Sequence, residues 1–194
     1  MSSLRNRVWP RLASLVRGAM FKLRQRELMS NPSSSRRILD YDRRLLPNHY
    51  LAEVEEGVHD LASAAARTGG SVGYPAWNLL YYSLLSSLPA GRPAVVVETG
   101  TNLGFSTIVL AQALADGGHS GLVRTVEIDP ATSEHARENV EHAGLSQFVK
   151  FAVGDSLAFL RGLDLDHVDF AFLDSDGQGK GQLARWAFFR RDDS

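Results

Sequence analysis

Hydrophobic residues recur with two different spacings along the chain, and the spacing changes near residue 94. Before that point, apolar residues at every third or fourth position predict one helix from Pro47 to Arg67, ended by Gly69–Gly70. A second helix is predicted over residues 76–88, AWNLLYYSLLSSL. Because this segment is apolar on most sides, we expect it to be buried.

After residue 93, short apolar runs alternate with helical patterns. The runs are rich in Val and Phe and do not alternate cleanly with polar residues, which is typical of strands buried on both faces. Strands that alternate with helices indicate a parallel sheet, so the predicted fold class is α/β. The predicted strands are 94–98, 122–129, 148–153 and 168–174, and the predicted helices are 104–115, 131–143 and a short one from Ser156.

Positive charge is concentrated at the N-terminus. Residues 1–44 contain eleven of the 21 Lys and Arg and three acids, whereas residues 45–194 contain ten bases and nineteen acids. The acidic part argues against a nucleic-acid surface, because phosphate contacts need clustered cations. Apolar residues at helical spacing among the arginines predict a basic amphipathic helix within residues 1–26. That helix could lie on an anionic membrane, act as a transit peptide, or pack on the domain or on a second subunit.

Composition excludes several other classes of protein. The chain has no cysteine, so disulfides, thiolate chemistry and zinc–cysteine sites are excluded. No apolar run approaches the roughly 18 residues that span a membrane, and arginines interrupt any secretory signal. We therefore expect a cytoplasmic protein.

Acidic residues follow each predicted strand. Ligands of open parallel sheets bind beyond the carboxyl ends of the strands, so these acids mark a predicted binding edge. A single acid in such a position can instead be a helix N-cap, which is the alternative for Asp129 and Asp155. The strand-end residues are Glu98, Glu127 with Asp129, Asp155 with Ser156, and Asp174 with Asp176.

The segment AVVVETGTNLGFST (94–107) joins the first strand to its helix through a glycine turn. Gly100 permits a positive φ and close approach of a ligand, and Gly104 lets the helix begin tight against the strand. The helix N-terminus favours a negative ligand group, either a pyrophosphate or a carboxylate. The dinucleotide fingerprint requires glycine at positions 102 and 105, where this chain has Asn102 and Phe105, so NAD is disfavoured.

Four segments in order resemble the motifs of class I S-adenosylmethionine-dependent methyltransferases, in particular the small-molecule O-methyltransferase branch. They are ETGTNLGFST, VEIDP, GDS and FLDSD, within residues 72–176, and the preceding YPAWNLLYYSLLSSL resembles the helix that covers the cofactor entrance in that family. The resemblance implies a Rossmann-like sheet with helices on both faces, preceded by N-terminal helices. It also implies S-adenosylmethionine as cofactor and a small-molecule acceptor.

The same resemblance implies roles at the methionine end of the cofactor. Glu98 would orient the loop or face the ammonium group, and Ser106 would lie near the carboxylate. The backbone of Gly100, Thr101 and Asn102 would line the methionine part, with Gly104 opening the helix behind it.

Other roles are implied for the nucleoside and for catalysis. Glu127 would accept hydrogen bonds from both ribose hydroxyls, and Asp155 would accept from the adenine amino group with Ser156 beside it. Asp174 occupies the position of a first magnesium ligand in metal-dependent members, where Mg²⁺ would lower the pKa of a substrate hydroxyl. The alternative is that Asp174 and Asp176 only cap the loop.

The chain offers four strands, whereas the family sheet has seven. We expect three regions: a basic helical arm and linker (1–35), a helical cover (36–93) and an incomplete cofactor domain (94–194). A shortened reading frame, completion by a partner subunit in a homo-oligomer, or a non-catalytic remnant would each explain this. The leading hypothesis is a small-molecule O-methyltransferase. The alternatives are a non-catalytic binding or interaction module and, less favoured, an NAD-dependent oxidoreductase.

Overall fold

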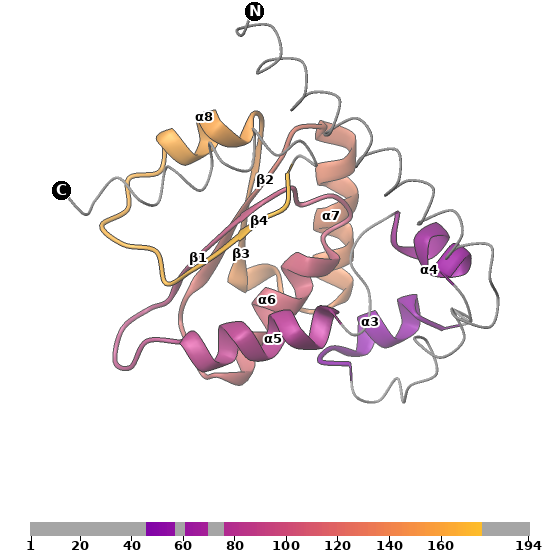
Figure 1. The fold of residues 1–194 in the computed structure, drawn as a ribbon, viewed down its shortest axis with the longest axis horizontal. Coiled ribbons are helices and arrows are strands. Elements are labelled where there is room, and N and C mark those ends of the chain that lie inside the picture. Colours follow the sequence, from indigo (N-terminus) through magenta and orange to yellow (C-terminus); the bar gives the residue numbers. More distant parts are fainter. Residues whose placement is uncertain (1–45, 57–60, 70–75, 176–194) are drawn as a thin grey trace, which may run out of the picture. The chain divides into compact units, whose positions relative to one another are not determined.

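A computed structural model of the chain describes residues 46–56, 61–69 and 76–175 (Figure 1). The chain divides into two compact units, and of the described residues only 61–64 belong to the first. The predicted basic helix within 1–26, its linker and Asp176 lie outside the described residues. Within the described ranges, no helix is both long and apolar enough to cross a membrane.

Four parallel strands form one sheet in the order β3-β2-β1-β4. Strand β1 is one of the two inner strands, and its residues 96–99 are buried. The parallel pairing confirms the predicted α/β, Rossmann-like sheet. The strands are β1 (Val95–Thr99), β2 (Leu122–Glu127), β3 (Val149–Val153) and β4 (Phe170–Leu173).

Helices cover both faces of the sheet (Figure 1). Helices α6 and α7 pack on one face, α5 packs on α6, and α8 lies against β2 on the other face. The helices of the described residues are α3 (His49–Val54), α4 (Leu61–Thr68), α5 (Ala76–Ser87), α6 (Phe105–Asp116), α7 (Pro130–His142), α8 (Ser156–Arg161) and the short 3₁₀ helix η2 (Ser146–Phe148).

The core is centred on α6, which lies between α5 and the sheet. Ile108, Leu110 and Leu114 are fully buried. Trp77 of α5 is also fully buried, and its ring centroid lies 5.9 Å from that of Phe105. A helix that is apolar on all sides is stable only in such a buried position.

Two expectations about burial are wrong. Strands β3 and β4 are not buried on both faces, and Val153 keeps 50% of its surface exposed. They are the outer strands of the four described, so each has one neighbour. Helix α5 is not buried all round, since Leu79 and Tyr82 are 72% and 64% exposed. It forms an outer layer over α6, so its far side faces away from the core.

The predicted single helix from Pro47 to Arg67 is also wrong, because α3 ends at Val54. The Glu56 N–H donates to the carbonyl of Glu53 at 3.1 Å, which tightens the last turn. Gly57 follows in the sequence, and glycine in a helix interior costs about 1 kcal/mol relative to alanine. A helical pattern of apolar positions therefore continues across a break in the helix.

Strands β1 and β4 are joined beyond their regular pairing at both ends. At the amino end, the Val95 N–H donates to Asp169 Oδ2 at 2.8 Å, and the Asp169 N–H donates to the Val95 carbonyl at 2.9 Å. Arg92 also donates to Asp169, and this hydrogen bond lowers the pKa of the carboxyl group. At the carboxyl end, the Asp174 N–H donates to the Thr99 carbonyl at 2.9 Å.

Candidate functional site

The register of the sheet brings the carboxyl ends of all four strands to one edge. Thr99 is the partner of both Val126 and Leu173, and Glu127 is the partner of Val153. The strand order changes direction here, because β4 pairs with β1 on the side opposite β2. Open α/β sheets bind their ligands at such a point, so this carboxyl edge is the candidate site.

The glycine turn begins at this edge. Gly100 has a φ of +85°, which confirms the predicted positive φ. The N–H groups of Gly100 and Thr101 both donate to the carbonyl of Val126, at 3.0 and 3.2 Å. A Cβ at Gly100 would lie 2.6 Å from the Asp174 carbonyl oxygen and 2.7 Å from Ser175 Cα. The close approach that requires glycine is therefore made to the end of β4.

The rest of the turn bends toward α7. Asn102 has a φ of +48° and Gly104 a φ of +81°. A Cβ at Gly104 would lie 3.1 Å from that of Ala136, so the tight packing is against α7 and not against the strand as expected. Thr101 is buried, and its hydroxyl lies 2.6 Å from that of Thr125. These contacts fix the course of the loop between β1 and α6.

Glu98 is a fully buried carboxylate beneath the turn. It accepts hydrogen bonds from the hydroxyls of Ser106 at 2.6 Å and Thr107 at 2.5 Å. Burial raises the pKa of Glu98, the hydroxyl donors oppose this shift, and the nearby Asp174 adds to it. Glu98 thus ties β1 to the first turn of α6. Of its two predicted roles, this geometry favours orienting the loop, and the Ser106 hydroxyl is directed to Glu98.

Glu127 is held at the edge by three backbone donors. Its Oε2 accepts from the N–H of Asn102 at 2.8 Å, and its Oε1 accepts from Ile128 at 2.9 Å and Asp129 at 3.2 Å. A carboxylate offers about four acceptor positions, so one remains for a further donor. The side chain is only half-buried, which leaves it accessible from solvent. The glycine turn and the second strand end therefore meet at this carboxylate.

Asp129 and Asp155 are both helix N-caps. Asp129 Oδ1 accepts from the N–H of Thr132 at 2.7 Å, and this contact lowers the pKa of its carboxyl group. Asp155 Oδ1 accepts from the N–H of Ala158 at 2.8 Å, and Ser156 beside it is buried. Both residues therefore cap a helix, as the alternative interpretation predicted. The cap occupies one carboxylate oxygen of Asp155, and the side chain of Asp155 is exposed.

Asp174 follows β4 beside Gly100. Its side chain reaches solvent, yet partial burial raises its pKa. Among the described residues, no three His, Asp or Glu side chains gather closely enough to hold a metal ion. Asp174 belongs to no such group, and its role as a magnesium ligand stays a prediction.

Two apolar side chains at this edge were not foreseen as site residues. Ile128 directly follows Glu127 and is 72% exposed, and Val153 at the end of β3 is 50% exposed. The sequence pattern included Ile128 in a strand over 122–129, but β2 ends at Glu127. An apolar residue immediately after a strand-end acid was the available signal. Together these side chains give the acidic edge an apolar surface.

Comparison with known proteins finds relatives of this region. A family model described as a methyltransferase domain matches residues 97–190. A catechol O-methyltransferase of Mycobacterium tuberculosis is 38% identical over 92 residues, which are 47% of this chain and 40% of that protein. A catechol O-methyltransferase of Niastella koreensis is 28% identical over 148 residues, 72% of this chain and 65% of that protein.

Solved structures show the same architecture. An O-methyltransferase from Bacillus cereus in complex with SAH superposes with a TM-score of 0.54 at 30% identity. The match covers 71% of this chain and 59% of that one. In each of these three comparisons the chain spans less than two thirds of the relative's own length.

Proposed function

We propose that this chain, a class I S-adenosylmethionine-dependent O-methyltransferase-like protein, binds S-adenosylmethionine at the carboxyl edge of its sheet and serves methyl transfer to a hydroxyl of a small molecule. One observation carries the proposal. The Glu127 carboxylate is fixed by three backbone donors where the glycine turn, β2 and two exposed apolar side chains meet.

The charge of the edge suits this cofactor. Glu127, Asp155 and Asp174 form no ion pair with another described residue, so their negative charge is available to a ligand. S-adenosylmethionine carries a sulfonium and an ammonium group, whereas the pyrophosphate of NAD would be repelled. The pyrophosphate fingerprint requires glycine at position 105, but this chain has a phenylalanine there, and its ring is buried against Trp77.

The nucleoside would be held by the ends of β2 and β3. Glu127 has the acceptor capacity for ribose hydroxyls, and a hydrogen bond to a charged group contributes about 1.5–3 kcal/mol. Asp155 would accept from the adenine amino group, with Ser156 behind it. Ile128 and Val153 offer exposed apolar surface for the flat faces of the base. Adenine suits both features, because its edges carry polar groups and its ring faces are apolar.

The methionine part would lie on the turn formed by Gly100, Thr101 and Asn102, ahead of Gly104. Glu98 would act from beneath as a positioning residue, because Ser106 and Thr107 bind it to α6. When bound, S-adenosylmethionine supplies an electrophilic methyl group. The chain's own contribution is to fix the orientation of that group, which is the main source of rate in a transfer of this kind.

Asp174 is the candidate ligand for a magnesium ion, which would lower the pKa of the acceptor hydroxyl, and this role stays a prediction. Membrane contact through residues 1–26, self-association and a cytoplasmic location stay predictions. The acceptor is a small molecule by analogy with the O-methyltransferase relatives, and a catechol is the first acceptor to test because two relatives carry that name.

Binding is tested by titration calorimetry of the full chain with S-adenosylmethionine, its demethylated product and NAD. We expect the first two to bind and NAD not to bind. Binding of NAD alone would overturn the proposal. Transfer of a labelled methyl group to a catechol is measured separately, because a chain that binds both nucleosides without turnover would be the non-catalytic module.

The Glu127→Ala variant is expected to weaken binding of the demethylated product at least tenfold, because it removes a charged hydrogen-bond acceptor. Glu134→Ala is the matched control. It removes an exposed carboxylate of α7 whose ion-pair partner is Arg137. An unchanged dissociation constant for Glu127→Ala would mean that this carboxylate does not contact the cofactor.

A further inference from the structure

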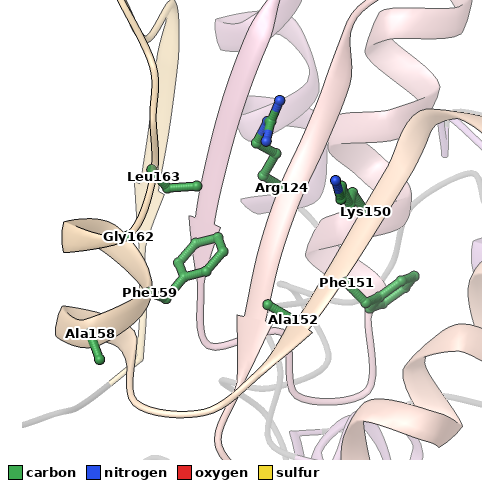
Figure 2. A pocket seen from close by; sticks show the side chains of 8 residues that line it. All are labelled: Arg124, Lys150, Phe151, Ala152, Ala158, Phe159, Gly162 and Leu163. Atoms are coloured by element: carbon green, nitrogen blue, oxygen red, sulfur yellow. The ribbon is translucent and has the colours of Figure 1, made fainter.

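A hollow lies on the opposite face of the sheet from α6 and α7, between the sheet and α8 (Figure 2). Its volume is about 300 Å³, which is at the lower end of the range for small-molecule sites. Its lining comes from β2, β3, α8 and the turn after α8. The lining residues are Arg124, Lys150, Phe151, Ala152, Ala158, Phe159, Gly162 and Leu163.

Two cations stand next to each other in this hollow. Arg124 of β2 and Lys150 of β3 are register partners, so their side chains project from neighbouring strands on the same face. Like charges directly opposite each other in a sheet are destabilising. Neither forms an ion pair with an acid in the described part of the chain, in contrast to Arg92 and Arg137. The pair therefore lacks a counter-charge among these residues.

The wall facing the cations is apolar. Figure 2 shows Phe159 of α8 and Leu163 directed toward the strands, with Ala152 next to Lys150 along β3. The Phe151 ring points to the other face, where the Arg137 guanidinium lies 4.6 Å from its centroid. The hollow thus combines a doubly cationic side with an aromatic and aliphatic side.

We propose that this hollow binds a small organic anion, with a carboxylate or phosphate group between Arg124 and Lys150 and an apolar body against Phe159 and Leu163. A guanidinium binds such groups through two parallel hydrogen bonds, and a neighbouring ammonium adds a second charge. The anion would also remove the repulsion between the two side chains.

The hollow is distinct from the carboxyl edge. Arg124 precedes Glu127 by three residues on the same strand, which corresponds to about 10 Å. Arg124 is also the partner of Val97, whereas the buried Glu98 is the partner of Thr125 on the opposite face. An anion between Arg124 and Lys150 would therefore lie away from Glu127 and Glu98, so its binding can be measured separately from that of the cofactor.

The test uses phenyl phosphate and benzoate as probes, with benzamide as the neutral match of benzoate, titrated into the full chain by calorimetry. We expect both anions to bind and benzamide not to bind. Arg124→Gln and Lys150→Gln should each weaken anion binding about tenfold, or about 1.4 kcal/mol. Arg161→Gln, which removes an exposed cation of α8 outside the lining, should leave it unchanged.

Two controls separate this proposal from the cofactor site. Saturating demethylated cofactor should not displace the anions, and Arg124→Gln should bind that nucleoside as the wild type does, which also shows that the variant is folded. The proposal is overturned if neither anion binds, if benzamide binds as well as benzoate, if the nucleoside displaces the anions, or if the Arg124 and Lys150 variants bind them normally.

Discussion

Two glycines with a left-handed backbone differ in what surrounds them. Gly100 has a φ of +85° and Gly91 a φ of +77°. A Cβ at Gly91 would meet nothing within 4 Å, whereas one at Gly100 would collide with the backbone of Asp174 and Ser175. The pair therefore separates the cost of a positive φ from the cost of crowding.

We predict that Gly91→Ala lowers the free energy of unfolding by about 1 kcal/mol, which is the strain of a left-handed alanine less the gain from a stiffer unfolded chain. Gly100→Ala should cost about 3 kcal/mol or more, because β4 must also move away. Urea denaturation of both variants measures the difference. If the two variants lose the same free energy of unfolding, the close contact between Gly100 and the end of β4 does not contribute to stability.

Glu98 makes stability depend on pH in a definite direction. Burial raises its pKa above the usual value of 4.5. Between the unfolded and the folded pKa, the folded state binds more protons, so the free energy of unfolding falls as the pH rises through that window. The stability associated with protonated Glu98 is complete below about 4.5 and is lost as the pH approaches the folded pKa.

We predict that Glu98→Gln flattens this decline, because an amide cannot ionise. The measurement is urea denaturation of both proteins at a series of pH values from 4 upward. Glu134→Gln, an exposed position on α7, should keep the wild-type slope. If the difference in stability between the wild type and Glu98→Gln does not change with pH, Glu98 does not carry the effect.

Helix α8 begins at an aspartate for which two functions are proposed. Asp155 caps the helix through Ala158, and it is our candidate acceptor for adenine. Asp155→Ala should cost about 1 kcal/mol of stability through loss of the cap. Asp155→Ser keeps a capping oxygen, so its stability should change by only a few tenths of a kcal/mol.

Both Asp155 variants should bind the demethylated cofactor more weakly, since neither has a carboxylate at this position. Asp129→Ser at the start of α7 is the matched control for exchanging one cap for another. Calorimetry and urea denaturation of the same three variants give affinity and stability separately. If Asp155→Ser binds the demethylated cofactor with wild-type affinity, Asp155 caps the helix and does not contact the cofactor.

The pattern of apolar residues predicted every strand of the sheet, because short Val-rich runs between helices have few alternatives. It overestimated the burial of β3 and β4, which each have one neighbour among the four described strands. Strand order depends on pairing between distant segments, which a local pattern does not contain. The break after Val54 was missed because the apolar positions keep helical spacing across Gly57.

The site was predictable where a residue's role is local. The positive φ of Gly100 and the capping alternative for Asp129 and Asp155 follow from neighbouring residues. The meeting of Glu127 with Asn102, the exposure of Ile128 and the pairing of Arg124 with Lys150 depend on sheet register. The sequence predicted that acidic residues lie at one edge of the sheet, but it did not predict which backbone N–H groups donate to them.

For the molecule as a whole, cofactor binding should appear as thermal stabilisation. A ligand at 100 times its dissociation constant adds about 2.7 kcal/mol to the free energy of unfolding. For a chain of this length that corresponds to a rise in Tm of about 5 to 10 °C. We predict this shift for S-adenosylmethionine and its demethylated product in a thermal melt, and no shift for NAD. The opposite ranking would favour the oxidoreductase hypothesis.

Strand β4 is fastened to β1 at both of its ends, by Asp169 and Val95 at one and by Asp174 and Thr99 at the other. Four residues separate these two attachments. Adding or deleting one residue between them would turn the side chains on one side of the change to the opposite face and break one attachment. Natural length variation in this part of the molecule should therefore be confined to the stretch between α8 and Asp169, where the chain can lengthen without moving Asp174 away from Gly100.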